Sequence, residues 1–536
     1  MFKSTNSILV LKNVFLLISF TFNIQKSSAQ IYQPVNCNLF QGCSCSLKSN
    51  VKYDIQCLPN DKTRPPFPIR NTPSNLTLQP MISLFMISSY NFTSLPPRIF
   101  QSLSIESLFL TDNNLMNITK ESFAGINSLK YLTIFEKALN IEPDSFRTIN
   151  ALEELSLAGQ LSDDKLEQLR NDLINIKSLK SLSLATNNIT SFDTRYTQFM
   201  SELQSLDLSQ NSIRYFGADV FRNLTKLQIL SLSFNPLNDS QHLFNNVLRP
   251  IQNNIVQLHL KSNQIDNLGN MSGYINLAKL DLSSNMISRL NNRLENMINL
   301  SELYLSNNKL EEFDNRAGMI KKLNVLDLKN NMINKFPNIS ELSDLSTLIL
   351  SNQNNKLQTL SNYAFERMMP TRKLIIDLRS NQFTKIDNKA FCSRFSQQSS
   401  IGRLQISYAS ARLLDKCHLK QLADLNDTNP FRLEIDAMEN TTNAVCSCDF
   451  REFAARFRIR LLGNCPLFNE GSCTNFNRTW LDDCNTKPHL VCGNTIMVEE
   501  KIQNGTTTSG GLKVHSLNGS NLYVSYFIVF IFVHLF

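Results

Sequence analysis

Apolar and polar residues alternate in one fixed pattern through most of the chain. Between Leu277 and Ile287, apolar residues stand at the first, fourth, sixth and eleventh positions, and Asn285 stands at the ninth. About a dozen copies follow one another at steps of 22 to 28 residues, with looser copies at both ends. Counted by the position that Asn285 holds, the copies fall at 113, 137, 160, 187, 211, 235, 263, 285, 308, 331, 355 and 381.

Each copy predicts one short strand and one turn. The alternation of Leu280 and Leu282 places both side chains on one face of a strand, with Asp281 on the other face. Asn285 follows where the chain leaves the strand, and its amide can bond backbone groups of the turn and of the next copy. Stacked copies then form a parallel sheet, and the phenylalanines further along each copy pack beneath it: Phe123, Phe146, Phe216 and Phe221.

This motif and period resemble the leucine-rich repeat. The resemblance implies an α/β leucine-rich repeat solenoid, a horseshoe with a concave parallel β-sheet, over residues 76–400. It implies disulfide-bonded caps at both ends, because a repeat stack exposes its terminal leucine layers to water.

The twelve cysteines support this interpretation, since all of them lie in two clusters at the ends of the array, residues 37–57 and 392–492, and an even number indicates disulfides in an oxidising compartment. Residues 30–75 resemble the N-terminal cap of extracellular leucine-rich repeat proteins, which implies the pairs Cys37–Cys45 and Cys43–Cys57. A zinc site is the alternative. The N-terminal cluster is Cys37, Cys43, Cys45 and Cys57, and the C-terminal one is Cys392, Cys417, Cys446, Cys448, Cys465, Cys473, Cys484 and Cys492.

Residues 401–495 resemble the C-terminal cap of the same proteins, through Asn429-Pro430 and the pair Cys446 and Cys448. About fifteen residues separate Pro430 from Cys446 and four cysteines follow instead of two, so the pairing stays open. Cys392 and Cys417 could bridge one irregular repeat. Helical spacing of apolar residues from Phe450 to Leu461 predicts an amphipathic helix.

Both ends predict processing. Residues 1–29 read as a secretory signal peptide, with an N-terminal membrane anchor as the alternative. At the C-terminus, a stalk (496–509) precedes a glycosylphosphatidylinositol-attachment propeptide (510–536), with Ser509 as the attachment residue. The final apolar run, 522–536, is short for a bilayer, although a single membrane span or a secreted form is the alternative.

The glycosylation sites and the net charge bear on where the protein is located and on which partners it binds. Sequons of the form Asn-x-Ser/Thr fit a secreted chain, and those that precede the expected propeptide are Asn75, Asn91, Asn117, Asn188, Asn223, Asn238, Asn270, Asn299, Asn338, Asn426, Asn440, Asn477 and Asn504. The formal charge of +8 falls to +4 without the four lysines of the removable ends, which is too low to predict a nucleic-acid partner.

No motif predicts catalysis, a cofactor or a metal. The six histidines form no metal-binding or nucleophile-activating motif. His259 is expected beside Asp281 on neighbouring strands, as an ordinary solvated pair. Aspartates recur in mid-strand at Asp207, Asp327 and Asp377, and we interpret them as part of the repeat.

Large apolar residues occupy outward positions in the first repeats, and exposed apolar patches tend to be binding sites. These candidate ligand-binding residues are Leu84, Met86, Phe109, Tyr131 and Phe135. The alternative is that the N-terminal cap covers them.

The sequence therefore favours a cell-surface recognition or adhesion protein. We expect it to bind an extracellular protein or glycoprotein on its concave face, with a membrane contact through the lipid and a possible co-receptor for signalling. A secreted matrix protein and a protein that captures microbial surfaces are the alternatives, and an enzyme is the least expected class.

Overall fold

A computed structural model describes the chain in residues 43–49, 52–58, 81–101, 103–313, 320–337, 342–361 and 374–387. It also describes residues 339, 364 and 390 and the strands at 401–407, 432–436 and 460–462. The expected signal peptide, stalk and lipid-attachment segment, with Ser509, lie outside these residues. In the part of the chain that is described, no helix is long and apolar enough to cross a membrane.

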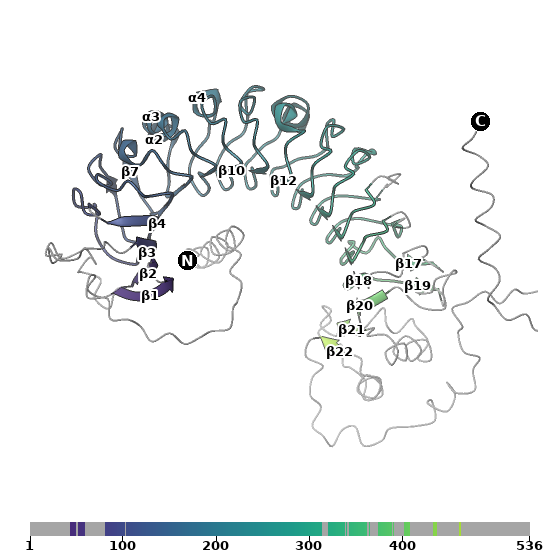
Figure 1. Cartoon of the computed structure of the whole chain (residues 1–536). Helices are drawn as coiled ribbons and strands as arrows, with labels where there is room; N and C mark the ends of the chain where they lie inside the picture. Colours follow the sequence, from purple (N-terminus) through teal and green to yellow (C-terminus); the bar gives the residue numbers. More distant parts are fainter. Residues whose placement is uncertain are drawn as a thin grey trace, which may run out of the picture. The chain divides into compact units, whose positions relative to one another are not determined.

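The described residues form an 18-stranded sheet in which neighbouring repeats contribute neighbouring parallel strands. Figure 1 shows the coils side by side in one row, with the strands along its inner edge. The repeat strands are β3 (Met81–Ser88), β4 (Ser104–Thr111), β6 (Tyr131–Phe135), β8 (Glu154–Ala158), β9 (Ser181–Ser183), β10 (Ser205–Asp207), β11 (Ile229–Ser231), β12 (Gln257–His259), β13 (Lys279–Asp281), β14 (Glu302–Tyr304), β15 (Val325–Asp327), β16 (Thr347–Ile349), β18 (Leu374–Asp377), β20 (Ile401–Ser407), β21 (Arg432–Asp436) and β22 (Arg460–Leu462).

The register is constant through the central repeats. Leu280 of β13 pairs with Leu258 of β12 and Leu303 of β14, and all three side chains are buried. The residues before and after each of these leucines are half-buried on the opposite face. The leucines thus fill one continuous core, and the sheet's other face is free for function, as the alternation predicts.

The returning segments pack beneath the sheet. Phe100, Phe123 and Phe146 come from three successive coils and are fully buried, with ring centroids 6.5 and 5.9 Å apart. Phe216 and Phe221 are buried as well, so the expected phenylalanine layer is confirmed. These segments hold the α-helices α2 (Asp163–Gln168), α3 (Arg170–Asn175), α4 (Thr194–Thr197) and α5 (Ser240–His242), the 3-10 helices η1 (Arg147–Ile149) and η3 (Arg249–Ile251), and the π-helix η2 (Leu243–Val247). They also hold two small strand pairs, β5 (Asn117–Ile118) with β7 (Asn140–Ile141) and β17 (Thr359–Leu360) with β19 (Lys385–Ile386).

Buried amides link each coil to the one before it. The Nδ2 of Asn285 donates to the carbonyl oxygens of Leu260 and Leu282 at 2.8 and 2.9 Å. Its Oδ1 accepts from the backbone N–H groups of Asn263 and Ile265, both at 3.0 Å. Equivalent bonds recur at Asn187, Asn211, Asn235, Asn308, Asn331 and Asn381, which confirms the predicted asparagine ladder at those positions.

Four ladder positions differ from the prediction. Asn263 is buried and its Oδ1 accepts from the backbone N–H of Asn235 at 2.9 Å, but its Nδ2 has no hydrogen-bond partner among the described residues. Gln353, and not Asn355, holds the place after β16: its Nε2 donates to the carbonyl of Leu328 at 2.8 Å, while Asn355 is exposed. The two additional residues of this repeat lie after the ladder position, because buried Leu357 follows Gln353 by four residues, whereas Ile287 follows Asn285 by two.

The other two differences lie in adjoining repeats. Buried Glu136 replaces exposed Lys137, and its carboxylate accepts the backbone N–H groups of Asn113 at 2.9 Å and Leu115 at 3.2 Å. In the next repeat Gln160 is exposed, and Gly159 lies where a side chain would collide with the Glu136 carbonyl. The turns after β6 and β8 are therefore closed by a carboxylate and by a glycine.

At the N-terminal edge, β1 (Cys43–Ser49) and β2 (Lys52–Cys57) form an antiparallel hairpin, and β2 pairs with β3. The disulfide Cys43–Cys57 closes this hairpin, which confirms that predicted pair, and Cys45 is also disulfide-bonded. Cys37 and the eight C-terminal cysteines lie outside the described residues. Most of the expected helix from 450 to 461 does too, although Leu461 lies in strand β22 instead.

Candidate ligand-binding face

The outward side chains of the sheet form two parallel rows, which together we call the strand face. Each row runs from strand to strand in the register of the sheet. The first row is Leu84, Ser107, Tyr131, Glu154, Ser181, Ser205, Ile229, Gln257, Lys279, Glu302, Val325, Thr347, Ile375 and Arg403. The second is Met86, Phe109, Thr133, Ser156, Ser183, Asp207, Ser231, His259, Asp281, Tyr304, Asp327, Ile349, Asp377 and Gln405.

The five apolar residues singled out in the sequence lie together on β3, β4 and β6. Met86 pairs with Phe109, while Leu84 and Tyr131 lie on either side of Ser107. Phe135 pairs with Thr111, one outward position further along the strands. Phe109 keeps only 8% of its surface exposed, and the other four are half-buried. The five residues therefore form one contiguous patch, and Phe109 is its most buried member.

A charged cluster follows in the central repeats. Lys279 Nζ lies 2.8 Å from Glu302 Oε2, and the Tyr304 hydroxyl donates to the same carboxylate at 3.0 Å. The Lys279 ammonium also lies 5.3 Å from the centroid of the Tyr304 ring, within the range of a cation–π contact. The three side chains come from adjacent strands, so they present one preorganised polar surface.

The packing of these side chains shifts the pKa values of Glu302 and Tyr304. Burial pushes the pKa of Glu302 upward, but the hydrogen bond and positive charge of Lys279 outweigh it, so the pKa is lowered. Burial and the neighbouring Glu302 carboxylate raise the pKa of Tyr304 to about 12. Glu302 is thus an anion and Tyr304 a neutral hydrogen-bond donor at physiological pH.

The mid-strand aspartates have a local structural role. Asp207, Asp281 and Asp327 each accept the backbone N–H two residues later, at 2.9 to 3.0 Å. Asp377 does the same with Arg379 and binds its guanidinium at 2.8 Å. Within the described ranges, no three acidic, histidine or cysteine residues gather as a metal site would require.

His259 lies between Ser231 and Asp281 in the second row, which confirms the expected neighbours. Burial lowers the pKa of this imidazole, against the attraction of the Asp281 carboxylate. The side chain is therefore mostly neutral at pH 7, and it can both donate and accept hydrogen bonds.

Sequence reasoning missed a buried charge at the C-terminal end of the sheet. Glu434 of β21 is fully buried and accepts from Arg403 at 2.7 Å and from Gln405 at 2.6 Å. The repeat motif is too degraded there to assign strands, so the sequence carried no usable signal for this triad.

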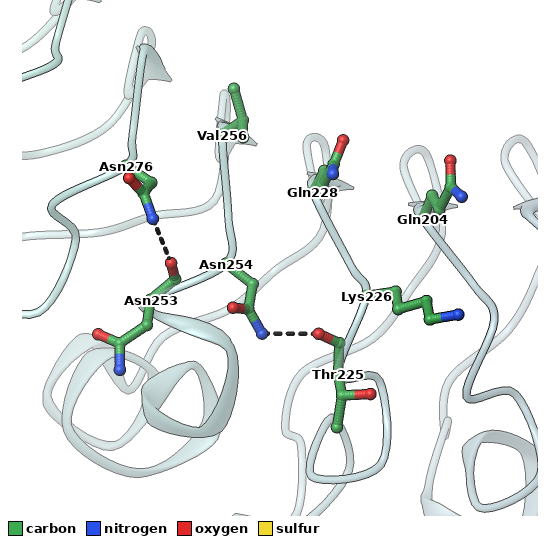
Figure 2. A pocket seen from close by; sticks show the side chains of 8 residues that line it. All are labelled: Gln204, Thr225, Lys226, Gln228, Asn253, Asn254, Val256 and Asn276. Carbon is green, nitrogen blue, oxygen red and sulfur yellow. Dashed lines mark hydrogen bonds between the residues drawn. The ribbon is translucent and has the colours of Figure 1, made fainter.

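Sequence reasoning also missed a polar pocket of about 510 Å³ on the flank of the array, where the chain enters strands β10 to β13 (Figure 2). A signal existed, since asparagine directly precedes the first apolar residue of three successive repeats, at Asn254, Asn276 and Asn299. The lining residues are Gln204, Thr225, Lys226, Gln228, Asn253, Asn254, Val256 and Asn276.

The described sequons lie away from the strand face, in turns and returning segments. Asn299 is half-buried, and its Nδ2 donates to the carbonyl of Ile275 at 2.8 Å. The side chains of Asn91, Asn117, Asn188, Asn223, Asn238 and Asn270 are exposed. Asn75, Asn338, Asn426, Asn440, Asn477 and Asn504 lie outside the described residues.

Comparison with known proteins agrees with this geometry. A family model described as leucine rich repeat matches residues 177–237, and a model of the BspA type leucine rich repeat region matches 82–171 and 334–432. A search of curated protein sequences gave no match.

Among solved structures, a chain of the Drosophila Toll–Spatzle complex is 17% identical, with a TM-score of 0.50 over 68% of this chain and 51% of that one. A leucine-rich repeat protein of Leptospira interrogans is 19% identical, with a TM-score of 0.48 over 71% of this chain and 95% of that one. An internalin of Listeria monocytogenes is 20% identical, with a TM-score of 0.39 over 58% and 80% of the two chains. At these identities the likeness concerns the fold alone. The family models and the repeating strand register identify the chain as a leucine-rich repeat protein.

Proposed function

We propose that this chain is an extracellular recognition protein that binds a protein or glycoprotein ligand on its strand face. The observation that carries the proposal is the make-up of that face. Its apolar patch of Leu84, Met86, Tyr131 and Phe135 lies at one end, and the Lys279–Glu302–Tyr304 cluster lies in the centre. Aromatic residues and methionine are enriched in protein interfaces, and tyrosine is a frequent anchor.

The pattern of modification sites supports the same face. Every sequon whose exposure is described lies off the two outward rows, so glycans attached there would leave the strand face open to a macromolecule. Pairing within the sheet also fixes the backbone beneath the outward side chains before a ligand binds, which lowers the ordering cost of binding.

We propose that the protein is located on the outer surface of the cell. The Cys43–Cys57 disulfide supports passage through an oxidising compartment. We further propose that residues 1–29 direct export and that a lipid attached at Ser509 anchors the protein, so that signalling requires a co-receptor. Release of the full chain from cultured animal cells by phosphatidylinositol-specific phospholipase C is expected; retention with the C-terminal peptide intact would contradict the lipid anchor.

The binding proposal is tested by photo-crosslinking in cells that display the full chain. Benzoyl-phenylalanine replaces Tyr131 or Tyr304 on the strand face, or Tyr215, which is 59% exposed on a returning segment, as the matched control. We expect a covalent adduct with a second protein from Tyr131 or Tyr304 and none from Tyr215. Adducts from Tyr215 alone, or from none of the three, would contradict the assignment.

A further inference from the structure

The flank pocket is lined almost entirely by side chains that can both donate and accept hydrogen bonds. Five of its eight residues are amides, and Thr225 adds a hydroxyl. Its apolar contribution comes from Val256, which is half-buried. Figure 2 shows these side chains on successive coils, so the same kind of group recurs from one repeat to the next.

Two of the amides are fixed in place by a second asparagine ladder. The Nδ2 of Asn254 donates to the carbonyl of Thr225, and that of Asn276 donates to the carbonyl of Asn253, both at 2.7 Å (Figure 2). Asn299 continues the ladder through the carbonyl of Ile275. Each bond immobilises one amide in a known orientation. Among the described residues, the side-chain oxygens of Asn254 and Asn276 accept no hydrogen bond and can accept one from a ligand, whereas that of Asn299 accepts from Lys322 Nζ at 2.7 Å.

Three further amides have no structural task. Within the described residues, the side chains of Gln204, Gln228 and Asn253 make no hydrogen bond, and all three are exposed. Gln204 and Gln228 serve the fold through their backbones, whose N–H groups donate to the preceding coil and whose carbonyls accept from the next one. The two glutamine side chains can therefore be removed without loss of the sheet.

The pocket carries little net charge. The Lys226 ammonium lies 2.6 Å from the Glu202 carboxylate, which compensates its charge. An anion or cation would thus find no uncompensated counter-charge among the lining residues. A neutral ligand rich in groups that donate and accept at once fits better, and sugar hydroxyl and acetamido groups have this chemistry. A peptide would also need apolar pockets for alternate side chains, and this site offers only Val256.

From these observations we propose that the flank pocket binds a neutral oligosaccharide with hydroxyl and acetamido groups. This site is separate from the strand face and does not depend on the protein ligand proposed there. The sugar can come from two sources. Thr225 is the third residue of the sequon that begins at the exposed Asn223, so a glycan on Asn223 would start two residues from the pocket lining. The other source is a free or foreign oligosaccharide.

Calorimetric titration of the purified full chain with N,N′,N″-triacetylchitotriose tests the proposal. The titration is made with the wild type and with Asn223→Gln, each with and without the pair Gln204→Ala and Gln228→Ala. Gln198→Ala, an exposed glutamine outside the pocket, is the matched control. Equal melting temperatures confirm that the variants are folded.

We expect Asn223→Gln to bind the trisaccharide, with at least a tenfold loss on adding the pocket pair and no change with Gln198→Ala. Equal binding by the wild type identifies a free sugar as the ligand, whereas binding only after Asn223→Gln identifies the chain's own glycan. No binding by Asn223→Gln, or binding that the pocket pair leaves unchanged, would overturn the proposal.

Discussion

The side chain of Asn285 accepts the backbone N–H of Asn263, which lies one repeat earlier, at 3.0 Å. The same amide donates to the carbonyl of Leu260 in that earlier repeat. One buried side chain thus satisfies donors and acceptors of two coils at once. Because no coil can bury its leucines alone, such bonds link neighbours that depend on one another for stability.

Replacing Asn285 with alanine should destabilise the array by about 3 kcal/mol, because buried backbone groups of two coils lose their partners. The urea unfolding midpoint measures this change. Asn296→Ala, at an exposed position, serves as the control and should have almost no effect. Equal midpoints for the two variants would show that the ladder adds no stability.

The structure and the sequence pattern differ in which residue, Gln353 or Asn355, holds the ladder position after β16. The pattern places Asn355 in the ladder, but it is the Gln353 side chain that donates to the carbonyl of Leu328 and accepts from the backbone N–H of Ile333. Gln353→Ala should therefore lower stability by about 2 kcal/mol. Asn355→Gly, which keeps the left-handed backbone at φ +59° accessible, should change it by less than about 0.5 kcal/mol. The reverse order of melting temperatures would restore the sequence-based register.

Gly159 cannot carry a side chain. A Cβ at this position would lie 1.6 Å from the carbonyl oxygen of Glu136, and its φ of +142° is unfavourable for other residues. Gly159→Ala should cost at least about 3 kcal/mol and reduce secretion of the folded chain. Gly217→Ala, whose Cβ would meet nothing within 4 Å, should be secreted normally. Normal secretion and melting of Gly159→Ala would refute the close approach.

His259 should make stability depend on pH. Burial lowers its folded-state pKa below 6.5, so the unfolded chain binds this proton more readily. The contribution of neutral His259 to the free energy of unfolding is complete above pH 6.5, and it is lost as the pH falls toward the folded-state pKa. The facing groups Asp207, Asp281, Lys279 and Glu302 modulate the folded value.

Melting temperatures of the wild type and His259→Gln, compared at pH 8.0 and pH 5.5, measure this contribution. The wild type should lose more stability than the variant on acidification. A variant that loses as much as the wild type, or more, would show that the imidazole is not the group responsible.

The leucine spacing predicted the parallel sheet, the buried face and most of the asparagine ladder, because these depend on positions that recur in each repeat. It could not predict that Glu136 or Gly159 closes a turn, since a carboxylate that accepts backbone N–H groups can replace an amide. Alternation gave the direction of the Phe109 side chain but not its 8% exposure. The flank pocket depends on how residues of several coils meet, which the motif of a single repeat does not show.

Glycan shielding of the strand face tests the central claim most directly. Tyr131→Asn creates a sequon with Leu132 and Thr133 in the apolar patch, and the same change combined with Thr133→Ala lacks the sequon. The measured quantity is binding of each purified, fluorescently labelled full chain to cultured animal cells that capture the wild type. We expect the glycan-bearing variant to lose at least tenfold in binding relative to the sequon-free variant, with equal melting temperatures. Equal binding, with the added glycan confirmed by mass spectrometry, would show that the ligand does not use this part of the strand face.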